Sequence, residues 1–145
     1  MFLVDTNAIS ELRKGARGDA GVVGLLREAE KSIFLPVQVL GELRYGIERL
    51  ERKGDLPQAR MVEEWFQSVL DIFDQRILGF DAVCAMTWGN LMGVNDQHIV
   101  DRQVAAIALV YDLTVVTRNT SHFAGTGARL LNPFFADVLP SQPAS

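Results

Sequence analysis

The first residues constrain the fold more than any other stretch of the chain. Residues 2–4 form a short apolar run, Phe-Leu-Val, that leads directly into Asp5, Thr6 and Asn7. A short apolar run bounded by polar residues is typical of a strand buried on both faces, as in a parallel sheet. Asp5 would then lie at the carboxyl end of this strand, where open α/β sheets bind their ligands. An aspartate at that position either caps the next helix or belongs to a site, and this stretch alone leaves both interpretations open.

Short apolar runs and amphipathic helices alternate along the rest of the chain. Further strands are predicted at 33–36, 77–80, 113–117 and 128–133, and helices over 8–14, 19–31, 37–53, 58–73, 82–92 and 101–111. This alternation predicts an α/β fold with a parallel sheet covered by helices on both faces. The 145 residues suit a single domain, which we place at 1–139, followed by a flexible tail over 140–145 that holds no core residues.

Composition limits the classes of function that the protein can have. The formal net charge of −4 argues against a protein that coats nucleic acid through bulk attraction, but not against an enzyme that acts on it with bound cations. The single cysteine, Cys84, excludes an internal disulfide, fits a reducing compartment and is expected to be buried. No apolar run approaches the roughly 20 residues of a membrane span, and no basic segment precedes the first strand. A cytoplasmic protein without a membrane contact or a signal peptide is therefore expected.

Three carboxylates lie where the predicted elements could bring them together. Asp5 follows the first strand, Asp101 is expected to open the apolar helix that leads into strand 113–117, and Glu42 lies beside the apolar stripe of helix 37–53. Helix capping remains an alternative for Asp101, and an ordinary boundary position remains one for Glu42. Carboxylates without a cysteine or histidine cluster favour Mg²⁺ or Mn²⁺. We interpret His98 and His122 as surface or hydrogen-bonding residues, because no spacing supports a zinc site.

In their order along the chain, these motifs resemble a known family. The resemblance rests on Val4-Asp5-Thr6-Asn7, Glu42 within 37–43, Asp101 followed by Ala105-Ala106, Val116-Thr117-Arg118-Asn119 with Phe123, and Asn132-Pro133-Phe134. The chain resembles a PIN domain and, more narrowly, a VapC-type toxin, the ribonuclease of a bacterial type II toxin–antitoxin pair. The resemblance extends from Phe2 to about Phe134.

The resemblance implies a three-layer α/β/α sandwich and metal-dependent cleavage of RNA phosphodiester bonds. It also implies a homodimer that is neutralised by a cognate antitoxin, with operator DNA bound only through the antitoxin. Asp5, Glu42 and Asp101 match the family's catalytic metal ligands for Mg²⁺ or Mn²⁺. The residues that match its substrate-binding or supporting positions are Thr6, Asn7, Thr117, Arg118, Asn119 and His122.

One position departs from the family pattern. Many members carry an aspartate where this chain has His122, so a fourth carboxylate is missing. Since fewer crowded acids attract a second cation less strongly, we expect one well-held Mg²⁺ or Mn²⁺. His122 is then expected to contact phosphate or water rather than metal.

Two other functions remain as alternatives. A phosphotransferase or phosphatase with Asp5 as nucleophile would need an acid at Asn7 or a lysine at Arg118, and the sequence has neither. A catalytically weak module of the same fold that binds RNA or a partner protein is compatible with the sequence, because His122 weakens the acidic site.

The two central helices also predict an assembly. Helices 37–53 and 58–73 carry more apolar surface than one small sheet needs, with Tyr45, Ile47, Trp65 and Phe66 available. We expect part of that surface to form a homodimer contact or an antitoxin groove.

Overall fold

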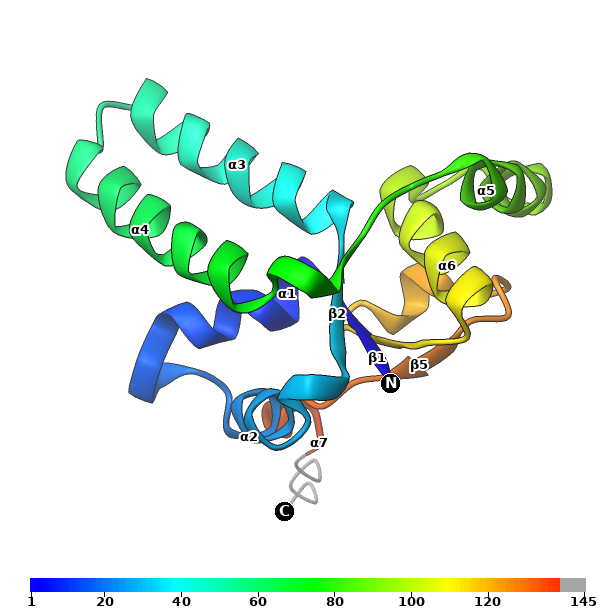
Figure 1. The fold of residues 1–145 in the computed structure, drawn as a ribbon, viewed down its shortest axis with the longest axis horizontal. Helices are drawn as coiled ribbons and strands as arrows, with labels where there is room; N and C mark the ends of the chain where they lie inside the picture. Colours follow the sequence, from blue (N-terminus) through cyan, green and yellow to red (C-terminus); the bar gives the residue numbers. More distant parts are fainter. Residues whose placement is uncertain (139–145) are drawn as a thin grey trace, which may run out of the picture.

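A parallel sheet of five strands, in the order β3-β2-β1-β4-β5, forms the centre of the molecule. Helices surround this sheet (Figure 1). The computed structural model describes residues 1–138, so the predicted tail over 140–145 lies outside the described residues. The strands are β1 (Phe2–Val4), β2 (Ile33–Pro36), β3 (Ile77–Leu78), β4 (Thr114–Val116) and β5 (Arg129–Leu131). All four neighbouring pairs run parallel, as the alternation of strands and helices predicted.

Helices connect and cover these strands. The longer ones are α2 (Ala20–Glu28), α3 (Val37–Arg52), α4 (Leu56–Ile72), α5 (Ala82–Val94) and α6 (Ile99–Tyr111). The short ones are α1 (Thr6–Ile9), α7 (Phe135–Val138) and the 3₁₀ helices η1 (Ser10–Arg17), η2 (Glu30–Ser32), η3 (Asp74–Arg76) and η4 (Thr120–Phe123). Helices α3 and α4 form a helical hairpin, which extends away from the sheet (Figure 1).

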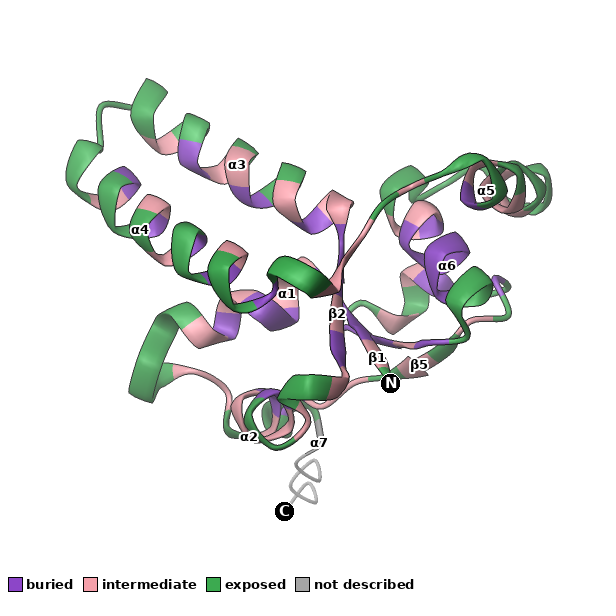
Figure 2. Cartoon of the chain, in the orientation of Figure 1, coloured by how far each residue is buried: buried purple, intermediate pink, exposed green. Residues whose placement is uncertain are grey.

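Successive residues of each strand point to opposite faces of the sheet and so contribute to two separate hydrophobic cores. Val4 and Val116 pack with apolar residues of α1, α2, α3 and α4 on one face of the sheet. Leu3 and Val115 pack on the other face with Cys84 and the inner side of α6, much of which is buried (Figure 2). These two cores confirm the three-layer α/β/α sandwich, and the burial of Cys84 is confirmed as well.

The strand order places a crevice beside β1. Strand β1 pairs with β2 on one side and with β4 on the other, so the chain first adds β2 and β3 on one side of β1 and then crosses over to add β4 and β5 on the other. Open α/β sheets bind ligands at such a switch point, outside the carboxyl ends of the strands. Asp5 follows β1 and Thr117 follows β4, and the Asp5 N–H donates to the Val116 carbonyl at 3.0 Å. The two side chains therefore start from adjacent positions at this edge.

The beginnings of two helices differ from the sequence predictions. Instead of one helix over 8–14, α1 begins at Thr6 and passes into η1, where Gly15 (φ 57°, ψ −125°) interrupts the helical backbone. Helix α6 begins at Ile99 after His98, which has left-handed backbone angles (φ 52°), so Asp101 is its third residue. The N-cap interpretation of Asp101 was therefore wrong, because the helix starts two residues earlier.

The apolar surface of the α3–α4 hairpin is smaller than expected. Ile47 and Phe66 are buried in the core and Trp65 packs against it, whereas Tyr45 remains exposed. Most of the residues invoked for an assembly surface are thus used inside the domain. Among residues 1–138, no helix has both the length and the apolar character needed to cross a bilayer.

Candidate active site

Asp5 is the most buried carboxylate of the site, with 3% of its surface exposed. Its Oδ1 accepts the Thr6 N–H at 2.9 Å, so it does cap α1. Its Oδ2 accepts the Thr117 hydroxyl at 2.9 Å and the Asn7 side-chain amide at 3.3 Å. Burial raises the pKa of Asp5, the hydrogen bonds from Thr6 and Thr117 oppose that rise, and the negative charge of Asp101 adds to it. Capping and membership of a site therefore coexist in one residue.

Thr117 connects the polar residues around Asp5. Its hydroxyl is fully buried and accepts the Asn7 amide at 3.1 Å and the Asn119 backbone N–H at 3.1 Å. The Asn7 side-chain oxygen in turn accepts the Arg118 N–H at 2.9 Å. This network joins the end of β4 to the start of α1 and fixes the orientation of the Asp5 carboxylate.

Glu42 comes from the first turns of α3 and faces the same site. The Thr6 hydroxyl donates to its Oε1 at 3.0 Å. Partial removal of the carboxyl group from water raises the pKa of Glu42, and the negative charges of Asp5 and Asp101 raise it further. The three acids predicted from sequence therefore share one electrostatic environment, although Glu42 itself is an exposed residue at the rim.

Asp101 lies in a compact group with both histidines. The Nδ1 atom of His122 lies 2.9 Å from Asp101 Oδ2, and because a carboxylate only accepts, the imidazole is the donor. The rings of His98 and His122 stack with centroids 4.0 Å apart. Among residues 1–138, His98, Asp101 and His122 are the one group of three such side chains whose ligand atoms all lie within 4.8 Å of one another. Asp5 and Glu42 lie outside this tight group.

A hollow of about 430 Å³ opens in front of these side chains. Its lining includes Glu42, Asp96, His98 and Asp101. Asp96 and His98 were not predicted as site residues. Both residues lie within the five positions before Asp101, and this closeness in sequence could have indicated that they lie near the site.

Two predicted supporting residues act through their backbones. The guanidinium of Arg118 pairs with Asp137 of α7 at 2.9 and 3.0 Å and lies over the Phe134 ring. Its side chain is thus engaged away from the acids, and its N–H is what reaches the site. Asn119 contributes the N–H that Thr117 accepts.

The donor set fits a hard divalent cation. Asp5, Glu42 and Asp101 supply carboxylate oxygens, the ligands that Mg²⁺ and Mn²⁺ prefer. Their hydrogen bonds use only part of the acceptor capacity of each carboxylate, since each can accept about four. Burial is the main cause of the raised pKa of Asp5 and of Glu42, the negative charges of neighbouring acids raise both further, and a divalent ion would offset that repulsion.

Comparison with known proteins identifies the family. The model for the PIN domain matches residues 2–127, and the chain belongs to this family. The plasmid stability protein StbB of Pseudomonas syringae pv. tomato is 30% identical over 141 residues, covering 94% of this chain and 100% of StbB. Toxin FitB of Neisseria gonorrhoeae is 30% identical over 92% of this chain and 99% of its own. The VapC ribonuclease Y4jK of Sinorhizobium fredii is 28% identical over 92% of this chain and 98% of its own.

Solved structures agree with these relatives. The FitAcB crystal structure from Neisseria gonorrhoeae superposes with a TM-score of 0.76 at 30% identity, covering 93% of this chain and 99% of that one. VapBC2 from Rickettsia felis, bound to a DNA fragment from its promoter, gives a TM-score of 0.65 at 26% identity over 90% and 97% of the two chains. The predicted α/β/α fold and the PIN resemblance are both confirmed.

Proposed function

We propose that this protein is a Mg²⁺- or Mn²⁺-dependent endoribonuclease and the toxin of a toxin–antitoxin pair, acting in the cytoplasm. The observation that carries the proposal is the proximity of Asp5, Glu42 and Asp101 at the switch-point edge: Thr6 donates to both Asp5 and Glu42, and Glu42 and Asp101 line one hollow. The family supports it, because relatives over almost the whole chain are named as a toxin and as a VapC ribonuclease.

Each residue has a distinct part in the proposed chemistry. Asp5, Glu42 and Asp101 would hold the ion, which when bound activates water and stabilises charge on phosphate oxygens. Thr117 and the Asn7 amide fix the Asp5 carboxylate, and the Thr6 hydroxyl fixes Glu42. Because these supports are neutral donors, they orient the carboxylates while leaving their negative charge available.

The proposed partners follow from the solved relatives. A cognate antitoxin would bind and silence the protein, and operator DNA would be reached only through the antitoxin. The FitAB complex has been solved on an IR36 DNA fragment, and VapBC2 on promoter DNA. We also propose that the protein forms a homodimer.

The decisive experiment compares matched substitutions of aspartate by asparagine. Asp5→Asn and Asp101→Asn should each abolish metal-dependent RNA cleavage by the antitoxin-free protein, while circular dichroism shows a retained fold. Asp112→Asn is the control: its side chain is 84% exposed, it caps the far end of α6, and asparagine tolerates its left-handed backbone. Expression of the wild type and the control should slow growth, and expression of the two site variants should not. Equal toxicity of Asp5→Asn would contradict the proposal.

His122 supports a second candidate function. Because it stands where many family members carry a carboxylate, the protein could bind RNA or a partner without appreciable cleavage. RNA binding by the wild type without any Mg²⁺- or Mn²⁺-dependent cleavage would favour this candidate over the nuclease.

A further inference from the structure

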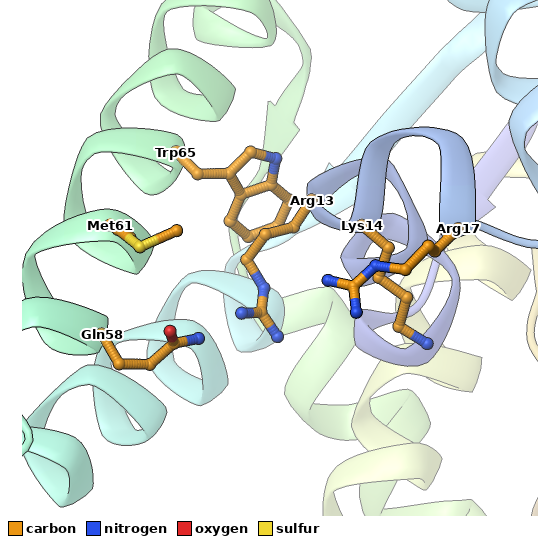
Figure 3. A pocket seen from close by; sticks show the side chains of 6 residues that line it. All are labelled: Arg13, Lys14, Arg17, Gln58, Met61 and Trp65. Atoms are coloured by element: carbon orange, nitrogen blue, oxygen red, sulfur yellow. The ribbon is translucent and has the colours of Figure 1, made fainter.

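A basic hollow lies apart from the acids, between η1 and α4. It has a volume of about 410 Å³ and is lined by Arg13, Lys14, Arg17, Gln58, Met61 and Trp65. Figure 3 shows the three cationic side chains entering from the N-terminal helical segment, opposite the indole and the Met61 side chain on α4. One wall is therefore positively charged, and the other presents an aromatic and apolar surface.

A neighbouring hollow shares part of this lining. It has a volume of about 320 Å³ and is lined by Thr6, Glu42, Arg13 and Gln58 together with Ser10 and mostly apolar residues of α3 and α4. Arg13 and Gln58 line both hollows. We treat the two hollows as one surface, the basic groove, whose lining includes both Glu42 and Trp65.

The cations of the basic groove are available to a ligand. Lys14 pairs with Glu11 at 3.0 Å, whereas Arg13 and Arg17 form no ion pair with any of residues 1–138. Both arginines are exposed. On a chain with a net charge of −4, two arginines that are unpaired within residues 1–138, beside the paired Lys14 on one short helical segment, make a local site for an anionic ligand.

We propose that the basic groove binds a single-stranded segment of the RNA substrate next to the phosphate that is cleaved. Arg13 and Arg17 would contact backbone phosphates, and the Trp65 indole would stack on a base. Cations that follow the backbone and an aromatic face that accepts any base are the two components of single-strand recognition. This inference rests on the proposed nuclease function and extends it to the substrate: unpaired RNA is favoured over a duplex, whose bases cannot reach the indole.

An acidic segment of a partner protein would also satisfy the charges. RNA is favoured because Arg13 and Glu42 line the same hollow, so one strand could contact a cation and the acidic site at once. A peptide carboxylate would also have no base to place on Trp65. The experiment below separates the two ligands.

The first measurement is the affinity of the protein for an unstructured RNA oligonucleotide, determined by fluorescence anisotropy. All variants carry Asp5→Asn to prevent cleavage of the RNA. Arg13→Gln combined with Arg17→Gln should weaken binding at least about tenfold and lower the slope of log Kd against log salt by about 1.4, or about 0.7 per phosphate contact. Arg60→Gln is the control for each single substitution, Arg13→Gln and Arg17→Gln, because it removes one arginine charge from α4 at a hollow lined instead by Glu51 and Glu63. The control should bind RNA as tightly as its parent.

The second measurement uses tryptophan fluorescence. The chain has two tryptophans, so Trp88→Phe leaves Trp65 as the single emitter. RNA should quench this emission as a base stacks on the indole, and polyglutamate at equal charge should neither quench it nor displace the RNA. Polyglutamate that displaces RNA from the groove would overturn the proposal in favour of an acidic peptide ligand.

Failure of this inference can be told apart from failure of the proposed function. If the protein cleaves RNA with Mg²⁺ but the double arginine variant binds RNA like the control, the basic groove is not the substrate site and the nuclease assignment stands. If the wild type neither binds nor cleaves RNA, both proposals fail.

Discussion

Removal of the Thr117 hydroxyl provides a direct test of how the site holds its buried carboxylate. Thr117→Val keeps the shape of the side chain but deletes three hydrogen bonds, to Asp5 at 2.9 Å and from Asn7 and the Asn119 N–H at 3.1 Å. The bond to Asp5 involves a charged acceptor and contributes about 1.5–3 kcal/mol, whereas water can replace the one to the exposed Asn119. We expect the free energy of unfolding to fall by about 2–3 kcal/mol at pH 7 without metal.

The expected loss depends on pH with a definite sign. The pKa of Asp5 is already raised by burial, and the Thr117 hydrogen bond partly offsets that rise, so its removal raises the pKa further. A raised folded-state pKa favours the folded protein when the group is protonated and costs stability as the pH rises through that pKa. The difference in stability between Thr117→Val and wild type should therefore be smallest at acid pH and grow toward neutral pH.

Urea denaturation from pH 5 to 8 measures this difference. Thr117→Ser is the control, because it keeps the hydroxyl and loses one methyl group, which should lower the free energy of unfolding by about 1 kcal/mol. In an Asp5→Asn background the cost of Thr117→Val should shrink, because the charged acceptor is gone. A pH-independent loss, or one that is unchanged in that background, would refute the role assigned to the hydroxyl.

Three further predictions follow from the same structure. His122→Asp should tighten Mg²⁺ binding in titration calorimetry, because it restores a fourth carboxylate beside Asp101; an unchanged affinity would place His122 outside the coordination shell. Mg²⁺ at a hundredfold excess over its Kd should raise the free energy of unfolding by about 2.7 kcal/mol at pH 7, and EDTA should remove this gain. The gain should be smaller at pH 5, because the pKa values of Asp5 and Glu42 are raised and protons compete with the ion for these carboxyls. Light scattering should find a homodimer, and Met86→Glu on α5, where Met86 and Val83 are 66% and 52% exposed, should convert it to a monomer.

The sequence predicts strands and capped helices well where local chemistry is sufficient. Asp19 and Asp81 accept N–H groups of the helices that follow them, as those residue types favour. Neighbouring parallel strands bring Asp5 and Thr117 together, which follows from apolar runs that end in polar residues. The amphipathic spacing of α3 and α4 likewise gives their bounds to within two residues.

The start of α6 could not be predicted in this way. Ile99 and Val100 are 53% and 41% exposed, so their apolar character gives no inward-facing pattern, and the left-handed His98 has no local signature. Arg102 was also missed as a core residue. It is 1% exposed and donates to the carbonyls of Gln97 and Ala124, which are contacts that only the tertiary fold supplies.

Comparison with the other carboxylates of the chain shows what is particular about the site. Asp137, Asp112 and Glu63 each pair with an arginine at 2.6–2.9 Å. Within residues 1–138, Asp5 and Glu42 take part in no ion pair, which is also true of the helix caps Asp19 and Asp81, but only Asp5 among these four is buried. The groups that donate to Asp5 are all neutral. Buried charge without a counter-ion is costly, and a fold selected for stability alone would place a cation there. Under the proposed function, this negative charge is left for a ligand of opposite sign, either the divalent ion or a cationic side chain of the antitoxin, and the two should compete for the same carboxylates.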